Sequence, residues 1–291
     1  MNKITLPIKN EIETFENNLK EVIFKENNFL VDDLNKFLFS NPKRLRPIFS
    51  FLFAKVLKIE NPLVLDIALI VELIHNASLI HDDIIDEEKT RRNHPTFFEK
   101  FGSKLAVLEG DLLLSLALEK LSETTLEISK IFAQKIKKTI NGEIIQNENI
   151  TKVTNIETYY KKTLDKTGNL FFATLESLYT LKNIDNKTKE KLNAFLKYYA
   201  LSFQINNDID NFQSNFTDFK NGNYTLPVIY FFMENNTADF NQTDICFTKY
   251  INKANQEAQD FKCKALENLS DIENSIYKDT LIKLTEYTLR S

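Results

Sequence analysis

Three aspartates stand in a stretch of the chain that is otherwise apolar. Asp82, Asp83 and Asp86 lie near the end of a run from Leu63 to Ile85 that should form a buried helix. Residues four apart share one face of a helix, so Asp82 and Asp86 point to the same side. Because uncompensated carboxylates are costly away from water, the cluster needs cations. Mg²⁺ prefers oxygen ligands and is commonly held by one or two carboxylates together with substrate phosphates. The pattern therefore predicts a magnesium site that binds a diphosphate.

A longer stripe of residues, polar except at Leu79, continues along the same predicted helix. Glu72, His75, Leu79, Asp82 and Asp86 follow one another at alternating spacings of three and four, which places them on one face. His75 alone would be interpreted as a core histidine satisfied by hydrogen bonds. Its position on the stripe favours contact with a phosphate.

Basic residues flank this helix in the sequence. Arg91 and Arg92 follow the carboxylates, and guanidinium groups bind phosphate oxygens through a planar fork of donors. Lys43 and Arg46 precede an apolar helix that should begin near Ile48, where the N-terminal N–H groups also favour an anion. Each basic pair alone would fit a solvated surface. Together with the carboxylates, they indicate a site for diphosphate groups.

The elements that position these residues should be helices. Five glycines and six prolines in 291 residues leave fewer turns than alternating strands and helices need. Apolar residues recur at helical spacing in several long segments. No repeat or low-complexity linker divides the chain, so we expect one domain over residues 1–291, with a loop at the Asn-rich stretch 234–244. The expected helices include residues 63–85, 105–121, 159–181, 192–212 and 276–289.

Composition excludes several classes of function. The net charge of −4, with both signs interspersed, does not fit a nucleic-acid surface. Cys246 and Cys263 have neither pairing nor metal-ligand spacing, which is typical of thiols in a reducing compartment. The N-terminus lacks the apolar core of a signal peptide, and Asp66 and Glu72 interrupt the best candidate for a membrane span. We expect a soluble cytoplasmic protein without a stable membrane anchor.

Seven short motifs follow one another in a fixed order between residues 40 and 230. Each is weak evidence alone, whereas the ordered set is specific. Together they resemble the motifs of the trans-isoprenyl diphosphate synthases, the polyprenyl synthetase family. The motifs are Lys43-Arg44-Leu45-Arg46-Pro47, Asp82-Asp83-Ile84-Ile85-Asp86, Arg91-Arg92, Gly110-Asp111, Gly142-Glu143-Ile144-Ile145-Gln146, Lys166-Thr167-Gly168 and Thr225-Leu226-Pro227.

The resemblance implies a fold and a reaction. The fold would be an all-α, single-domain helix bundle of the isoprenoid synthase type with a central active-site cavity, usually assembled as a homodimer. The reaction would be a Mg²⁺-dependent prenyl transfer. An allylic diphosphate ionises, its carbocation alkylates the double bond of isopentenyl diphosphate, and a proton is lost. Mg²⁺ would stabilise the charge on the departing diphosphate.

The resemblance also implies roles for individual residues. Asp82 and Asp86, with Asp208, would ligate Mg²⁺, and Asp83 would support them. Lys166 would join the first three aspartates as a catalytic residue. The residues expected to bind isopentenyl diphosphate are Lys43, Arg46, His75 and Arg92, and those expected to bind the allylic diphosphate are Arg91, Lys166, Thr167 and Gln204.

The chain departs from the family pattern at the second aspartate-rich motif. Where the family has a second DDxxD, Asn207, Asp208 and Asn211 occupy the three acidic positions, so two carboxylates are replaced by amides. An amide oxygen can ligate Mg²⁺ but brings no charge. We therefore expect an active synthase with an unusually high Mg²⁺ requirement. Glycines that the family places beside its basic motifs are also replaced, by Asn41, Pro42 and Asn93.

Small residues precede the first aspartate and bear on product length. Ala77 and Ser78 lie one helical turn before Asp82, so a growing prenyl tail would meet no bulky side chain there. This favours a product of twenty carbons or more, although close helix packing explains the same residues.

Two other functions fit parts of the pattern. A non-catalytic subunit of a heteromeric prenyl synthase would explain the altered second motif. A terpene cyclase would share the helical architecture and one aspartate-rich helix, but it would not need residues for isopentenyl diphosphate.

Overall fold

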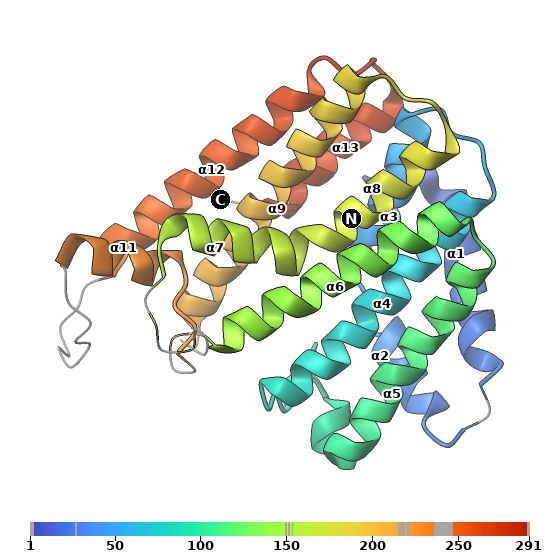
Figure 1. The fold of residues 1–291 in the computed structure, drawn as a ribbon, viewed down its shortest axis with the longest axis horizontal. Coiled ribbons are helices and arrows are strands. Elements are labelled where there is room, and N and C mark those ends of the chain that lie inside the picture. Colours follow the sequence, from blue (N-terminus) through green and yellow to red (C-terminus); the bar gives the residue numbers. More distant parts are fainter. Residues whose placement is uncertain are drawn as a thin grey trace. The chain divides into compact units, whose positions relative to one another are not determined.

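The computed structural model describes residues 3–26, 28–148, 150, 152, 154–214, 219, 222–235 and 247–289. Across these residues the chain is built from helices, with one pair of two-residue strands (Figure 1). The expected all-α fold is confirmed. Contacts between residues divide the chain into two compact units. Such units can belong to one domain, so the expectation of one domain stays a prediction. The first unit comprises Asn2–Phe132 with Ala173–Asn183, and the second comprises Ala133–Phe172 with Ile184–Ser291.

The first unit is organised around one long apolar helix, α4 (Leu63–Ile85), which packs against α5 (Phe97–Ser122) and α3 (Leu45–Val56). Pro62 is the N-cap of α4, a position where a missing N–H costs little. Thr96 caps α5 by accepting a hydrogen bond from the Glu99 amide, and Gly102 interrupts the helical geometry with φ of 78°. The unit also contains η1 (Leu6–Ile8), α1 (Lys9–Phe24), α2 (Val31–Phe39) and the antiparallel strands β1 (Thr90–Arg91) and β2 (His94–Pro95).

One expectation about α4 was wrong. Asp66 and Glu72 do not disqualify it as a membrane span, because the helix is long and apolar enough by length and composition. However, 67% of its most apolar 18-residue window is buried inside the protein. A helix that is apolar all round and buried by its own protein is a core helix.

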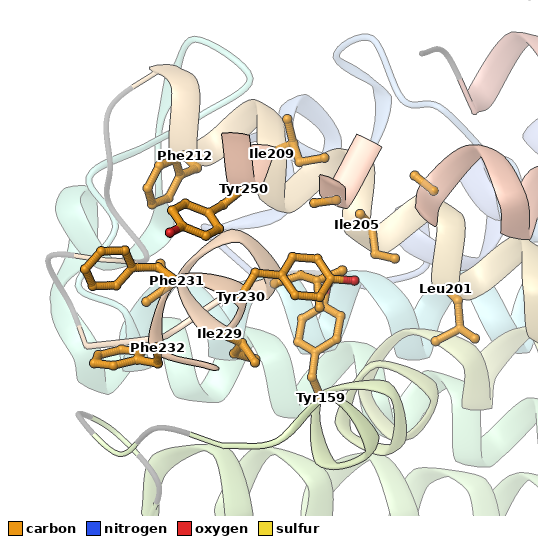
Figure 2. Packing of buried hydrophobic residues seen from close by; sticks show 14 of the residues in the cluster. Tyr159, Leu201, Ile205, Ile209, Phe212, Ile229, Tyr230, Phe231, Phe232 and Tyr250 are labelled. Atoms are coloured by element: carbon orange, nitrogen blue, oxygen red, sulfur yellow. The ribbon is translucent and has the colours of Figure 1, made fainter. Parts of the chain in front are cut away.

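The second unit has a core rich in aromatic residues. Figure 2 shows Tyr159 entering this core from α7 (Ile156–Thr163), together with Tyr230 and Phe231 of α11 (Leu226–Asn235). Within this unit, α9 (Asn186–Ser214) packs extensively against α12 (Thr248–Leu269). Its other elements are a π-helical turn η2 (Leu164–Gly168) and α13 (Ile276–Thr288), while α6 (Leu126–Glu148) and α8 (Asn169–Leu181) contribute residues to both units.

Apolar spacing located the long helices but not their limits. The expected helix at 105–121 begins earlier, at Phe97, because Thr96 supplies an N-cap. The expected helix at 159–181 is three consecutive elements, α7, η2 and α8, and its π-helical turn has no signature in the apolar pattern. The expected loop at 234–244 lies mostly outside the described residues.

Candidate active site

The carboxylates of the first motif lie at the end of α4. Asp82 is half-buried, and Asp86 is exposed at the C-cap, where its amide bonds the Asp82 carbonyl at 2.8 Å. The four-residue register expected of the two aspartates is therefore present. Asp83 faces elsewhere: it is buried, and its Oδ1 accepts from Nε of Arg91 at 2.8 Å and lies 2.6 Å from Nη2. Asp83 thus holds Arg91, the last residue of β1.

A glycine on α5 lets a histidine of α4 lie against the neighbouring helix. A Cβ at Gly110 would stand 2.2 Å from Nε2 of His81, so no larger residue fits unless the ring moves. His81 Nε2 also lies 3.4 Å from Oδ1 of Asp111. Gly110 and Asp111 therefore contact His81, the residue immediately before Asp82.

Four arginines act electrostatically on His75, which lies about two turns before Asp82 on α4. Burial is the main cause that lowers the pKa of His75 well below its usual value, and the positive charges of Arg46, Arg92, Arg91 and Arg44 lower it further. The imidazole is therefore neutral at neutral pH. The structure thus brings Arg46, His75 and Arg92 into one electropositive region, as expected for a diphosphate site. Lys43, two residues before the start of α3, is exposed.

Arg44 occupies a buried position that sequence reasoning did not assign. Its Nε and Nη2 donate to the two carboxylate oxygens of Glu16 at 2.7 and 3.1 Å, and its Nη1 donates to Glu72 at 2.9 Å. Its guanidinium also lies over the rings of Phe15 and Phe39. Arg44 is the N-cap of α3, so these contacts fix the start of the helix that carries Arg46. Glu16 belongs to α1, which no motif indicated.

The asparagines that replace family glycines adopt glycine-like backbone conformations. Asn41 has φ of 53° and Asn93 has φ of 66°. Asparagine tolerates this left-handed region better than other residues with a side chain. Arg44 and Arg92 also have positive φ, at 49° and 51°. The basic loops therefore keep the turns that glycine would allow.

In the second unit, two motifs meet through a close approach of α6 to η2. A Cβ at Gly142 would stand 3.1 Å from Cβ of Asp165, so the glycine permits this contact. The neighbouring Glu143 then reaches Lys166, with 2.8 Å between Oε2 and Nζ. The Gly-Glu motif thus orients the lysine of the Lys-Thr-Gly motif.

A chain of hydrogen bonds links the remaining site residues of this unit. Thr167 donates to Oε1 of Gln204 at 2.7 Å, and Nε2 of Gln204 donates to Oδ1 of Asp208 at 2.7 Å. The Tyr159 hydroxyl donates to the other oxygen of Asp208 at 2.6 Å. Burial raises the pKa of Asp208, while these hydrogen bonds and the charges of Lys162 and Lys166 lower it.

These groups line a small hollow of about 80 Å³. Sequence reasoning identified four of its residues, Lys166, Thr167, Gln204 and Asp208, but missed Tyr159 and Lys162. The spacing of Tyr159, Lys162 and Lys166 by three and four was a signal that could have found them. Asn207 is exposed on α9, and Asn211 is half-buried.

Asp82 and Asp86 could ligate a divalent metal whose remaining ligands come from the substrate and from water. Among the residues that the structure describes, no group of three or more His, Cys, Asp or Glu side chains could hold a metal ion unaided. Asp82 and Asp86 supply two hard oxygen ligands in register, which is the protein share typical of a Mg²⁺ site finished by phosphate oxygens and water. The donor set therefore suits a metal–diphosphate complex better than a metal alone.

Comparison with known proteins identifies relatives over nearly the whole chain. A sequence model described as polyprenyl synthetase matches residues 28–267. A prenyl transferase of Cyanophora paradoxa is 30% identical, covering 98% of this chain and 97% of that protein. Solanesyl diphosphate synthase 1, chloroplastic, of Arabidopsis thaliana is 29% identical, covering 96% of this chain and 76% of that protein.

Solved structures share the architecture. Heptaprenyl diphosphate synthase of Staphylococcus aureus superimposes with a TM-score of 0.88 at 26% identity, covering 97% of both chains. A polyprenyl synthase of Caulobacter crescentus, solved in complex with calcium and isoprenyl diphosphate, superimposes with a TM-score of 0.85 at 22% identity, covering 99% of this chain and 97% of that chain.

Proposed function

Because this chain belongs to the polyprenyl synthetase family, we propose that it is a trans-prenyltransferase that condenses isopentenyl diphosphate with an allylic diphosphate. The C–O bond of the allylic substrate breaks, and diphosphate leaves with the electron pair. The double bond of isopentenyl diphosphate attacks the carbocation, a C–C bond forms, and a proton is lost to give a longer prenyl diphosphate. The observation that carries the proposal is the register of Asp82 and Asp86 beside an arginine cluster in a chain of this family.

We assign residues of each unit to the binding of a substrate. In the first unit, we assign the binding of isopentenyl diphosphate to Lys43, Arg46, His75 and Arg92. Neutral His75 can donate one N–H to a phosphate oxygen without adding to the repulsion among the arginines. We assign Arg91 to the allylic diphosphate, with Asp83 holding its guanidinium in place.

In the second unit, we assign Lys166, Thr167 and Gln204 to the allylic diphosphate. Glu143 orients the Lys166 ammonium, and Thr167 and Gln204 are held by the hydrogen-bond chain that ends at Asp208. A lysine so placed can stabilise the negative charge that develops on the leaving group.

The metal of the family reaction is divalent, and we propose that it is Mg²⁺. Asp82 and Asp86 would ligate it, and the metal would stabilise the departing diphosphate. Asp208 is proposed as a further ligand. Both of its oxygens already accept a hydrogen bond, so a metal would have to share them with Tyr159 and Gln204.

We propose a product of twenty carbons or more. Ala77 is buried, and Ser78 bonds back to the carbonyl of His75 at 2.8 Å, so neither places a bulky group on α4 one turn before Asp82. The names of relatives, solanesyl and heptaprenyl diphosphate synthase, are those of long-chain enzymes.

We also propose a soluble, cytoplasmic homodimer. Large apolar side chains are exposed on α6, where Ile140 and Ile144 lie four residues apart and are 54% and 53% exposed. Exposed apolar stripes of this kind commonly mark protein contacts. The mass in solution, measured by sedimentation equilibrium, tests the dimer, and cell fractionation tests the compartment.

The test of function is incubation of the purified chain with Mg²⁺, labelled isopentenyl diphosphate and an allylic diphosphate. We expect labelled products longer than the primer, and chromatography reads their length. Chelation of the metal should abolish turnover. Asp82→Asn should lower kcat by about a hundredfold or more, because it removes a charge from the metal site.

Two results would contradict parts of this proposal. A dominant product of fifteen carbons would overturn the chain length. An inactive chain that gains activity only with another subunit would favour the alternative suggested by Asn207 and Asn211, a non-catalytic subunit of a heteromeric synthase.

A further inference from the structure

Tyr159 brings a hydroxyl group into the aromatic core of the second unit. The side chain is 2% exposed, and Figure 2 shows it within the buried hydrophobic cluster that also contains Tyr230 and Phe231. Its hydroxyl donates to Oδ2 of Asp208 at 2.6 Å, and Asp208 is buried as well. A phenylalanine ring would fill the same space without a polar atom. The hydroxyl group therefore serves the carboxylate rather than the packing of the core.

Two hydrogen bonds hold Asp208 from two directions. Nε2 of Gln204 donates to Oδ1 at 2.7 Å, and Tyr159 donates to Oδ2. Gln204 and Asp208 lie one turn apart on α9, so their bond stays within one helix. Tyr159 lies on α7, so its bond ties the carboxylate to a neighbouring helix. Rotation of the carboxylate about its Cβ–Cγ bond would break this tie, and Tyr159 therefore fixes its orientation.

The orientation of Asp208 in turn sets that of Gln204 and Thr167. An ionised carboxylate only accepts hydrogen bonds, so Gln204 must turn its NH₂ group toward Asp208. The amide oxygen then faces Thr167, whose hydroxyl donates to it at 2.7 Å. We assign Gln204 and Thr167 to the allylic diphosphate, so the positions of both depend on the carboxylate that Tyr159 holds.

Asp208 also interacts with two lysines that line the same hollow. Burial raises the pKa of Asp208, and the positive charges of Lys162 and Lys166 are among the interactions that lower it. Without the Tyr159 hydrogen bond, a buried oxygen of Asp208 would lack its donor, and the carboxylate would draw more strongly on these ammonium groups. Lys166, which we assign to the allylic diphosphate, would then be less available to the substrate.

We propose that Tyr159 is a positioning residue for the allylic site, acting through Asp208 on the residues assigned to the allylic diphosphate. The inference rests on the proposed function and adds to it a residue that need not touch the substrate. Loss of the hydroxyl should weaken the binding of the allylic diphosphate. The site for isopentenyl diphosphate, which we assign to the first unit, should be unaffected.

The test is Tyr159→Phe, which removes the hydroxyl and keeps the ring. Tyr230→Phe is the matched control, because it makes the same change in the same core, at a side chain that is 4% exposed. Asp208→Asn and the double variant Asp208→Asn/Tyr159→Phe complete a double-mutant cycle. The probe is an allylic thiodiphosphate, in which sulfur replaces the bridging oxygen to suppress ionisation. Calorimetry with Mg²⁺ gives its Kd, and steady-state kinetics give the KM of isopentenyl diphosphate.

Tyr159→Phe should raise the Kd of the thiodiphosphate by about tenfold, the effect of one lost hydrogen bond to a charged group. Tyr230→Phe should match the wild type. In the Asp208→Asn background, loss of the Tyr159 hydroxyl should change the Kd by less than about twofold, because the carboxylate that it holds is already absent. The KM of isopentenyl diphosphate should change by less than about twofold in Tyr159→Phe. Thermal unfolding of every variant distinguishes lost stability from lost binding.

Equal Kd values for Tyr159→Phe and Tyr230→Phe would overturn the inference whatever the change in stability, as would an equal rise in the KM of isopentenyl diphosphate. Equal effects of the Tyr159 substitution with and without Asp208→Asn would overturn it too, because Tyr159 would then act independently of the carboxylate. If Tyr159→Phe does not fold, Asp208→Asn is compared with the double variant: equal Kd values support the inference, and a further loss of affinity overturns it. A wild-type chain that does not bind the thiodiphosphate would overturn the proposed function itself.

Discussion

Glu109 directly precedes Gly110, the glycine that lies against His81. Its side chain is buried, which is unfavourable for a charged carboxylate. It is 2% exposed, and its Oε1 has no hydrogen-bond partner among the described residues. Burial, followed by the negative charge of Glu26, raises its pKa from 4.5 to about 7. Its protonation state therefore changes near neutral pH, whereas that of an ordinary glutamate does not.

The consequence is a loss of stability as pH rises. The unfolded chain releases this proton near pH 4.5 and the folded chain near pH 7, so the folded state binds more protons between these values. Glu109→Gln should therefore raise the free energy of unfolding at pH 8 by up to about 3 kcal/mol and change it little at pH 4.5. Denaturant unfolding at both pH values measures this. Glu119→Gln, exposed on the same helix, is the control, and an equal gain in both variants would contradict the prediction.

At the scale of elements, the contact between α4 and α5 depends on Gly110. Gly110→Ala places a methyl group 2.2 Å from the present position of His81 Nε2, so the imidazole ring must shift. We expect a loss of about 1–3 kcal/mol in the free energy of unfolding, because the ring must leave its packed position. Combining it with His81→Ala, which removes the ring, should recover most of the loss. Additive effects of the two changes, measured by thermal unfolding, would argue against this contact.

A second coupling between elements runs from α1 through Arg44 to the start of α3, which carries Arg46. Glu16→Gln keeps the shape of the side chain but removes the charge that pairs with Arg44. We expect a loss of about 1–2 kcal/mol of stability, less than for a fully buried pair because Glu16 is partly exposed. The KM of isopentenyl diphosphate should rise several-fold, by the order of 1 kcal/mol, with that of the allylic substrate unchanged. Glu13→Gln, exposed on the same helix, should alter neither KM.

These elements also show what sequence can and cannot predict. The apolar period identified α4, and the register of Asp82 with Asp86 followed from it. The motifs also indicated Gly110 and Gly142, but only the structure shows that one accommodates His81 and the other Asp165. Such pairs depend on how helices pack, and side-chain spacing along one helix carries no information about its neighbour.

Residues outside the motifs were harder to find. Glu16 and Arg44 are 28 positions apart, so no local pattern joins them. Tyr159 was assigned to an apolar segment, although its hydroxyl bonds Asp208. A buried tyrosine has both an apolar ring and a polar group, and only its surroundings show which one determines its position.

At the scale of the whole molecule, the charge of the predicted site differs between the units. The predicted metal ligands of the first unit are Asp82 and Asp86, whereas the second unit has Asp208 beside the uncharged Asn207 and Asn211. Asn207→Asp adds a carboxylate to the second unit at an exposed position. We expect it to lower the Mg²⁺ concentration for half-maximal activity several-fold, because an additional charge strengthens metal binding by the order of 1 kcal/mol. Titration of activity against Mg²⁺ checks this, and identical curves for the two proteins would contradict the expected high metal requirement.

The left-handed turns at Asn41 and Asn93 affect how the chain meets its substrates. Asparagine holds these turns with fewer accessible backbone states than glycine, so each loop has less freedom to lose. If Arg92 binds a diphosphate as we propose, most of its ordering is completed during folding. The use of asparagine in place of glycine at these two turns would then preorganise the proposed binding site, so that less affinity is lost to ordering its loops.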